Sequence, residues 1–215
     1  VAFLTNILGY VFNWCYLLLK NYWFAIGLFT LLSKVILIPV SIWVQKNSIK
    51  LVRLMPEINQ IKVKYFGDND RIGEEQQALY KRERYNPFLS LIPLVIQILI
   101  LVGLIGTIRE VTRNASAASL APIPTESGGV VLLMPILAAL AALALGLFQN
   151  THNPLQKEQS KSSQICTNSV SIAVSLFLGL FVPVGVGFYW VCSNLFTIAQ
   201  QIFLNIIIPP KKYID

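Results

Sequence analysis

The chain has few of the side chains that carry chemistry inside a membrane or bind a metal. Only 13% of its 215 residues are charged, and there is a single histidine, His152. The acidic residues all lie outside the long apolar stretches: Glu57, Asp68, Asp70, Glu74, Glu75, Glu83, Glu110, Glu126, Glu158 and Asp215. Proton and cation pumps normally need an intramembrane carboxylate or histidine, and a metal site needs clustered ligands. We therefore expect no pump, no metal site, no cofactor and no catalytic residue.

Cysteine is also scarce. Cys15, Cys166 and Cys192 are an odd number, scattered through apolar sequence. This spacing does not suggest a disulfide framework or a metal site. We expect all three to behave as small buried hydrophobic residues.

Hydrophobic residues dominate instead. They make up 55% of the chain, and the mean hydropathy is +0.63. Soluble domains are about 25% charged, so the composition indicates an integral membrane protein. Five apolar segments are long enough to cross a bilayer as helices: 22–44, 88–108, 130–149, 165–182 and 185–208. They lack the period-two alternation of a β-barrel. The sequence thus predicts an all-α integral membrane protein, with five transmembrane helices in a single domain, 1–215.

The net charge of +7 is unevenly distributed. Most basic residues lie in three segments on one predicted side: 45–86, the loop 150–164 and the tail 209–215. The opposite side, which includes the external loop 109–129, has only Lys20, Arg109 and Arg113. The positive-inside rule then places the N-terminus outside and the C-terminus in the cytoplasm of a multi-pass cell-membrane protein.

Two further elements flank the first span. Residues 3–20 carry one polar stripe on an otherwise apolar helix, which predicts an amphipathic helix on the outer membrane surface. A short sixth crossing is the alternative. Residues 45–86 predict a cytoplasmic helical hairpin, loosely attached and mobile. Its first helix is expected to begin at Pro56 and its turn to lie at 67–70.

The basic residues of the hairpin suit anionic headgroups or an incoming chain. A plain solvated connector is the alternative interpretation. The candidate contact residues are Lys62, Lys64, Arg71, Lys81, Arg82 and Arg84.

Lys34 lies in the middle of the first span, with no acidic residue in any span to pair with it. A charge at the bilayer centre costs about 2.5–3.5 kcal/mol on insertion scales. Pro39 follows five residues later and should break or kink the helix, which leaves a backbone carbonyl in need of protein or water. Together, Lys34 and Pro39 predict a hydrated cavity that reaches the middle of the membrane.

Uncharged polar residues also occur in the spans. Hydrogen bonding between helices is the simpler interpretation of any one of them. With Lys34 they are consistent with a hydrated groove: Gln97, Gln149, Asn150, Ser193, Asn194, Gln200, Gln201 and Asn205. A serine activated by a lysine is an enzymatic alternative, for which Ser33, Ser41 and Ser193 are the candidates, although Ser33 is expected to point elsewhere on its helix.

Three motifs in the same order resemble the YidC-type membrane protein insertases. Residues 182–201, VPVGVGFYWVCSNLFTIAQQ, resemble the last transmembrane helix of that family. Residues 86–97, NPFLSLIPLVIQ, resemble its second core helix. Residues 34–39, KVILIP, resemble the first, where the family usually has arginine in place of Lys34. The resemblance covers nearly the whole chain, and the lack of a large external domain resembles the shorter Gram-positive form.

The resemblance implies a function without covalent chemistry. Family members insert and fold nascent membrane proteins, alone or with the Sec translocon, and often receive chains from ribosomes. Their five helices enclose a positively charged groove that is open to the cytoplasm and to lipid. The positions expected to line this groove are Lys34, Gln97, Gln149, Trp190, Ser193, Asn194 and Gln201. Lysine keeps the charge of the family's arginine but lacks its planar fork.

We expect nascent membrane proteins and membrane lipids as partners, with the Sec translocon and the ribosome as further candidates, and no sequence-specific nucleic-acid binding. Two other functions remain open on the sequence. One is a transporter or channel for an anionic small molecule that binds at Lys34. The other is a purely structural assembly factor.

Overall fold

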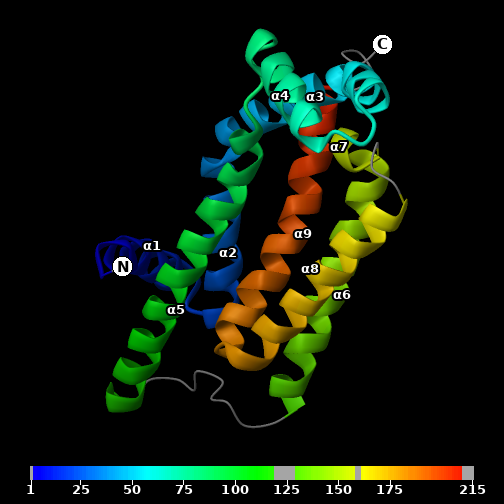
Figure 1. The fold of residues 1–215 in the computed structure, drawn as a ribbon. Coiled ribbons are helices and arrows are strands. Elements are labelled where there is room, and N and C mark those ends of the chain that lie inside the picture. The colour runs from blue at the N-terminus through cyan, green and yellow to red at the C-terminus, as the bar shows by residue number, and fades with distance from the viewer. Residues whose placement is uncertain (1, 119–128, 158–160, 210–215) are drawn as a thin grey trace.

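The computed structural model describes residues 2–118, 129–157 and 161–209. Over these residues the chain is entirely helical, with no strand. Five helices run along the long axis of the molecule (Figure 1): α2 (Tyr22–Ile36), α5 (Ile92–Ala118), α6 (Gly129–His152), α8 (Lys161–Phe181) and α9 (Val184–Ile207). α1 (Ala2–Leu19) lies across this direction. The other elements are α3 (Ile38–Lys64), α4 (Asn69–Arg82), the 3-10 helix η1 (Pro87–Leu91) and α7 (Pro154–Lys157).

Several of these helices can cross a membrane. Among the described residues, three are long and apolar enough: Leu133–His152 in α6, Gln164–Phe181 in α8 and Val184–Ile207 in α9. The pair α2 and α3 becomes a fourth if it is taken as one broken span. In α5 the apolar part is the shorter stretch Val95–Ile108. The described part of the chain is thus all-helical, with three or four candidate membrane spans.

The first span is broken where the sequence predicts it. The Asn21 side chain caps α2 by accepting hydrogen bonds from the backbone N–H groups of Trp23 and Phe24. α2 ends at Ile36 and α3 starts at Ile38, at an angle of 53°. Pro39 lies in the first turn of α3, where its missing N–H is tolerated. The predicted break near Pro39 is therefore confirmed.

Two predicted boundaries are wrong. No helix begins at Pro56, because α3 continues through it from Ile38 to Lys64. Pro56 is exposed, so the backbone position that lacks an N–H is on the solvated side of the helix. The expected external loop does not begin at 109, because α5 continues to Ala118, in a stretch whose alanines favour helix; the apolar part of α5 still ends at Ile108. The rest of the expected external loop, 119–128, lies outside the described residues.

The cytoplasmic loop expected at 150–164 is partly helical. α6 continues to His152, the four-residue α7 follows, and α8 already begins at Lys161. Residues 158–160 of this loop, like 210–215 of the expected tail, lie outside the described residues.

The main hydrophobic core joins four helices. Phe12 of α1, Phe29 of α2, Leu104 of α5 and Tyr189 of α9 are all buried in one cluster. Phe12 packs edge-on against Phe29, with ring centroids 6.2 Å apart. α1 is thus fastened to α2 and α5, and it keeps Tyr10, Trp14 and Leu17 exposed. Cys15 is buried there too, whereas Cys166 is exposed, so the expectation that every cysteine is buried is wrong.

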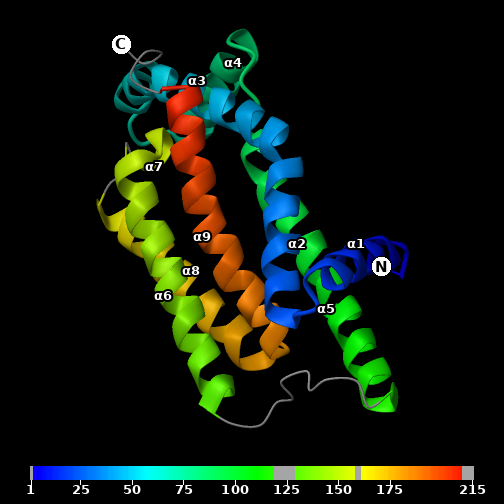
Figure 2. The same cartoon turned by 180° about the vertical axis from the view of Figure 1, so that it is seen from behind.

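The hairpin formed by α3 and α4 has a small core of its own. Leu54 and Ile58 of α3 pack against Leu79 of α4 and against Tyr85. The Asp68 side chain caps α4 by accepting from the Arg71 N–H at 3.1 Å. Figures 1 and 2 show this hairpin at the same end of the molecule as α7 and the C-terminal end of α9.

Candidate functional site

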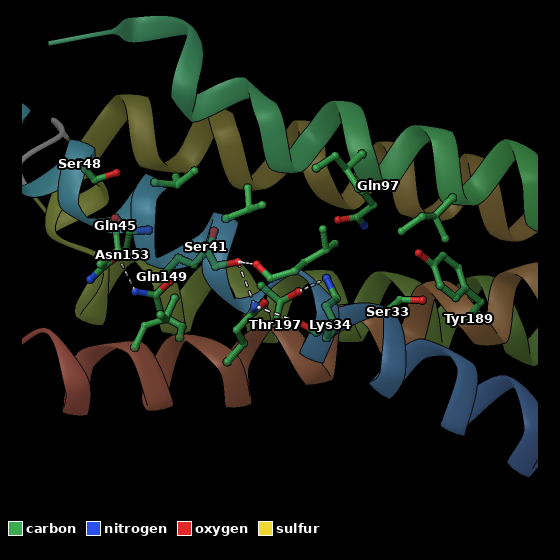
Figure 3. A pocket seen from close by; sticks show the side chains of 18 residues that line it. Ser33, Lys34, Ser41, Gln45, Ser48, Gln97, Gln149, Asn153, Tyr189 and Thr197 are labelled. Carbon is green, nitrogen blue, oxygen red and sulfur yellow. Dashed lines mark hydrogen bonds between the residues drawn. The ribbon is translucent and has the colours of Figure 1, made fainter. Parts of the chain in front are cut away.

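A polar cavity of about 260 Å³ lies between α2, α3, α5, α9 and the end of α6. Figure 3 shows the side chains that line it. Its apolar lining comes from Leu37, Val40, Val44, Ile96, Ile100 and Leu204. Its polar lining is Ser33, Lys34, Ser41, Gln45, Ser48, Gln97, Gln149, Asn153, Tyr189, Thr197, Gln200 and Gln201. Lys34 is the one charged side chain among these lining residues.

The Lys34 side chain is held by α9. It extends from the last turn of α2, and its Nζ donates a hydrogen bond to Thr197 Oγ1 at 2.9 Å. The Thr197 hydroxyl in turn donates to the backbone carbonyl of Ser193 at 2.7 Å. Within the described ranges, no carboxylate forms an ion pair with Lys34. The cavity therefore has a positive charge with no anionic counterpart from those ranges.

Further hydrogen bonds connect α9 to α3 beyond the break. Gln200 Nε2 donates to Ser41 Oγ at 2.9 Å and lies 3.5 Å from the Lys34 carbonyl oxygen. One turn on, Gln45 Nε2 donates to Asn205 Oδ1 at 3.1 Å, and Asn205 Nδ2 donates to the carbonyl of His152 at 3.1 Å. Ser41, Gln45, Gln200 and Asn205 thus connect α9 to α3 and to the end of α6.

Four of the expected groove residues lie together in the cavity lining: Lys34, Gln97, Gln149 and Gln201. Trp190 is not among the lining residues, and its Nε1 donates to Ser175 Oγ on α8 at 3.0 Å. Ser193 and Asn194 are also absent from the lining, although both are buried.

The basic residues of the hairpin lie elsewhere. Lys64 and Arg82 line a separate cleft between α3 and α4. Arg82 pairs with Glu57 at 2.6 Å and with Glu83 at 3.0 Å. Glu83 raises the pKa of Arg82 through a hydrogen bond, and Glu57 adds to the effect. The remaining candidates do not line the cavity: Lys62, Arg71, Lys81 and Arg84.

Sequence reasoning missed several lining residues. Gln45 and Ser48 belong to α3, which continues the interrupted first span, and Thr197 lies one turn before Gln200 and Gln201. The spacing of these residues in the sequence could have indicated that they share a helical face with the predicted groove residues. Positions 34, 37, 41, 45 and 48 recur every three or four residues, which is the spacing of one helical face. Positions 197, 200, 201 and 204 recur in the same way.

Two of the three serines considered for a serine–lysine site, Ser33 and Ser41, donate their hydroxyl protons to backbone carbonyls. Ser33 Oγ donates to the Phe29 carbonyl at 2.8 Å, and Ser41 Oγ donates to the Leu37 carbonyl at 3.0 Å. The Lys34 amine instead contacts a threonine whose proton is already donated to the Ser193 carbonyl. A lysine that activates a serine must be within hydrogen-bond reach of its hydroxyl.

Comparison with known proteins assigns the family. Residues 14–211 match the family model described as 60Kd inner membrane protein, the YidC/Oxa1 family. The chain belongs to this family. The resemblance drawn from the three sequence motifs is therefore confirmed. The YidC family is a family of membrane proteins and not of enzymes.

Similar proteins are named membrane protein insertase YidC. The chain is 31% identical over 171 residues to the one from Clostridium tetani, covering 80% of this chain and 76% of the relative. It is 28% identical over 194 residues to the one from Caldanaerobacter subterraneus, covering 89% and 88%. Identity to the one from Ralstonia nicotianae is 27% over 176 residues, which is 81% of this chain but 30% of that longer relative.

Proposed function

We propose that this chain is a membrane protein insertase that lodges the polar segment of a nascent membrane protein in the cavity around Lys34. The observation that carries the proposal is the Lys34 amine, which forms no ion pair with the described residues and lies in a cavity otherwise lined by uncharged side chains, most of them polar. A charge at this depth is energetically costly, and such a cost is usually retained only where the charge serves a function. An acidic or polar guest would be attracted to it in this low-dielectric setting.

The physical role of the cavity is to lower a barrier. A polar segment that crosses the hydrocarbon core loses its hydration. Hydroxyl and amide groups of the cavity lining, such as those of Ser41, Gln97 and Gln149, replace part of that hydration. The apolar segment of the passenger then enters lipid, which supplies roughly 25 cal/mol per Å² of buried apolar surface.

The proposed orientation follows from the charge distribution. The hairpin, α7 and the end of α9 face the cytoplasm, with the N-terminus outside and five helices crossing the membrane. The cavity opens to the cytoplasm and is closed on the outer side. The α3–α4 hairpin first meets the nascent chain, and the Sec translocon and the ribosome are further proposed partners. The exposed apolar side chains of α1 support its placement at the outer membrane surface.

A depletion-and-rescue assay tests the role of the charge. Cells depleted of their own insertase are supplied with the wild-type chain, Lys34→Arg or Lys34→Ala, together with single-span passengers. The passengers carry either an acidic external tail or the same tail with amides in place of the carboxylates. Lys34→Arg should retain insertion of both.

Lys34→Ala should lose insertion of the acidic-tailed passenger selectively, by about tenfold, the change expected when one charged hydrogen-bond donor is removed. Full insertion of the acidic-tailed passenger by Lys34→Ala would remove the proposed role of the charge. The relatives described above are named insertases, and nothing favours a transporter of anionic solutes.

A further inference from the structure

One hydroxyl group fixes the position of the charged amine in the cavity. Thr197 Oγ1 accepts from Lys34 Nζ at 2.9 Å and donates to the Ser193 carbonyl at 2.7 Å. A threonine hydroxyl has one proton and two lone pairs. Because the proton is directed along α9 to Ser193, the lone pairs remain for the amine.

The rest of the Thr197 side chain is also constrained. A β-branched side chain in a helix has few rotamers, and a hydroxyl bonded to the carbonyl four residues earlier selects one of them. The lysine side chain is the opposite case, a flexible stem with a point charge at its tip. The position of the Lys34 amine is therefore set by α9 more than by α2.

The amine retains binding capacity in this arrangement. An ammonium group has three protons, and the bond to Thr197 uses one. Gln97, on α5, extends toward the same cavity from the opposite wall (Figure 3). Two protons can then be directed to a carboxylate that enters between α5 and α9.

We propose that Thr197 is a positioning residue, which holds the Lys34 ammonium so that the cavity prefers passengers with acidic segments. The inference rests on the proposed insertase function and deepens it. It makes preference for acidic tails a property of the Lys34–Thr197 pair and not of the lysine alone.

The test replaces Thr197 and compares the two passengers in the depletion-and-rescue assay. The readout is the ratio of the insertion rate of the acidic-tailed passenger to that of the amide-tailed one. Thr197→Val keeps the shape but removes the hydroxyl, and it should lower this ratio by about threefold to tenfold, the size of effect typical for loss of one intramolecular hydrogen bond. Thr197→Ser keeps the hydroxyl and should preserve the ratio.

Thr30→Val is the matched control. Thr30 is buried in α2 and makes the same kind of bond, from Oγ1 to the Ile26 carbonyl at 2.7 Å, but it does not line the cavity. It should leave the ratio unchanged. If Thr197→Val is poorly folded by thermal unfolding in detergent, Thr197→Ala takes its place with the same expected ratio.

The outcomes separate the two proposals. If Lys34→Ala lowers the ratio while Thr197→Val and Thr197→Ala leave it at the wild-type value, the positioning role is wrong and the proposed function stands. A ratio that rises in Thr197→Val would mean that the hydroxyl competes with the passenger, which also overturns the inference. An unchanged ratio in Lys34→Ala contradicts the proposed role of the charge itself.

Discussion

Gln200 Nε2 lies 2.9 Å from Ser41 Oγ and so connects α9 to the first span on the far side of its break. The same nitrogen lies 3.5 Å from the carbonyl oxygen of Lys34, on the near side. Carbonyls next to a broken helix need a partner at membrane depth. Gln200 thus bridges the two halves of the broken span.

Removal of this bridge should weaken the bundle. Gln200→Leu preserves size but removes the donor, and we expect a loss of roughly 0.6–1.5 kcal/mol in the free energy of unfolding, typical of one interhelical hydrogen bond. Thermal unfolding in detergent measures it. Ser41→Ala completes a double-mutant cycle, in which the double variant should lose less than the sum of the single losses. Strict additivity would show that the two side chains do not interact.

Gly179 marks the close packing of α6 and α8. A Cβ at this position would lie 2.5 Å from the backbone Cα of Pro135, so the two helices would have to separate. Gly179→Ala should destabilise the protein by about 1–3 kcal/mol, as overpacking does. Gly27→Ala is the control, because nothing lies within 4 Å of a Cβ there. Comparable melting temperatures for the two variants would contradict the close packing of α6 on α8.

Leu79 tests whether the hairpin is a packed unit. Its side chain is 4% exposed, against Leu54, Ile58 and Tyr85. Leu79→Ala should cost about 2–5 kcal/mol of local stability and increase proteolysis between 45 and 86, while the transmembrane bundle stays intact. Val63, which is 78% exposed on α3, provides the control, and Val63→Ala should be cleaved like the wild type. Unchanged proteolysis of Leu79→Ala would contradict the packing of α3 against α4 as one unit.

The sequence predicts the all-helical class and the presence of membrane spans, because membrane helices are recognised by their length and hydropathy. The break at Pro39 followed from the missing N–H of proline. The prediction that a helix begins at Pro56 was wrong, because this proline is exposed and α3 continues through it. Whether a proline ends a helix depends on what surrounds the carbonyl it leaves free, which local sequence does not specify.

The site was only partly predictable for a related reason. Lys34 stands out because a charge in an apolar segment has a known cost. Nothing in the local sequence distinguishes Thr197, Gln45 and Ser48. Their place in the cavity depends on which helices pack together, and so on residues far away in the chain. Trp190 was expected in the groove from the family resemblance. In the structure its indole N–H donates a hydrogen bond to Ser175 on α8.

Crosslinking from position 97 tests whether the polar segment of a passenger passes through the cavity. A photo-crosslinking amino acid at position 97 faces the cavity across from Lys34, and one at Tyr10, which is 79% exposed on α1, serves as the control. During insertion of a single-span passenger, we expect its polar external tail to become attached at position 97 and hardly at all at position 10. Attachment of that tail at position 10 with none at position 97 would contradict passage of the polar segment through the cavity.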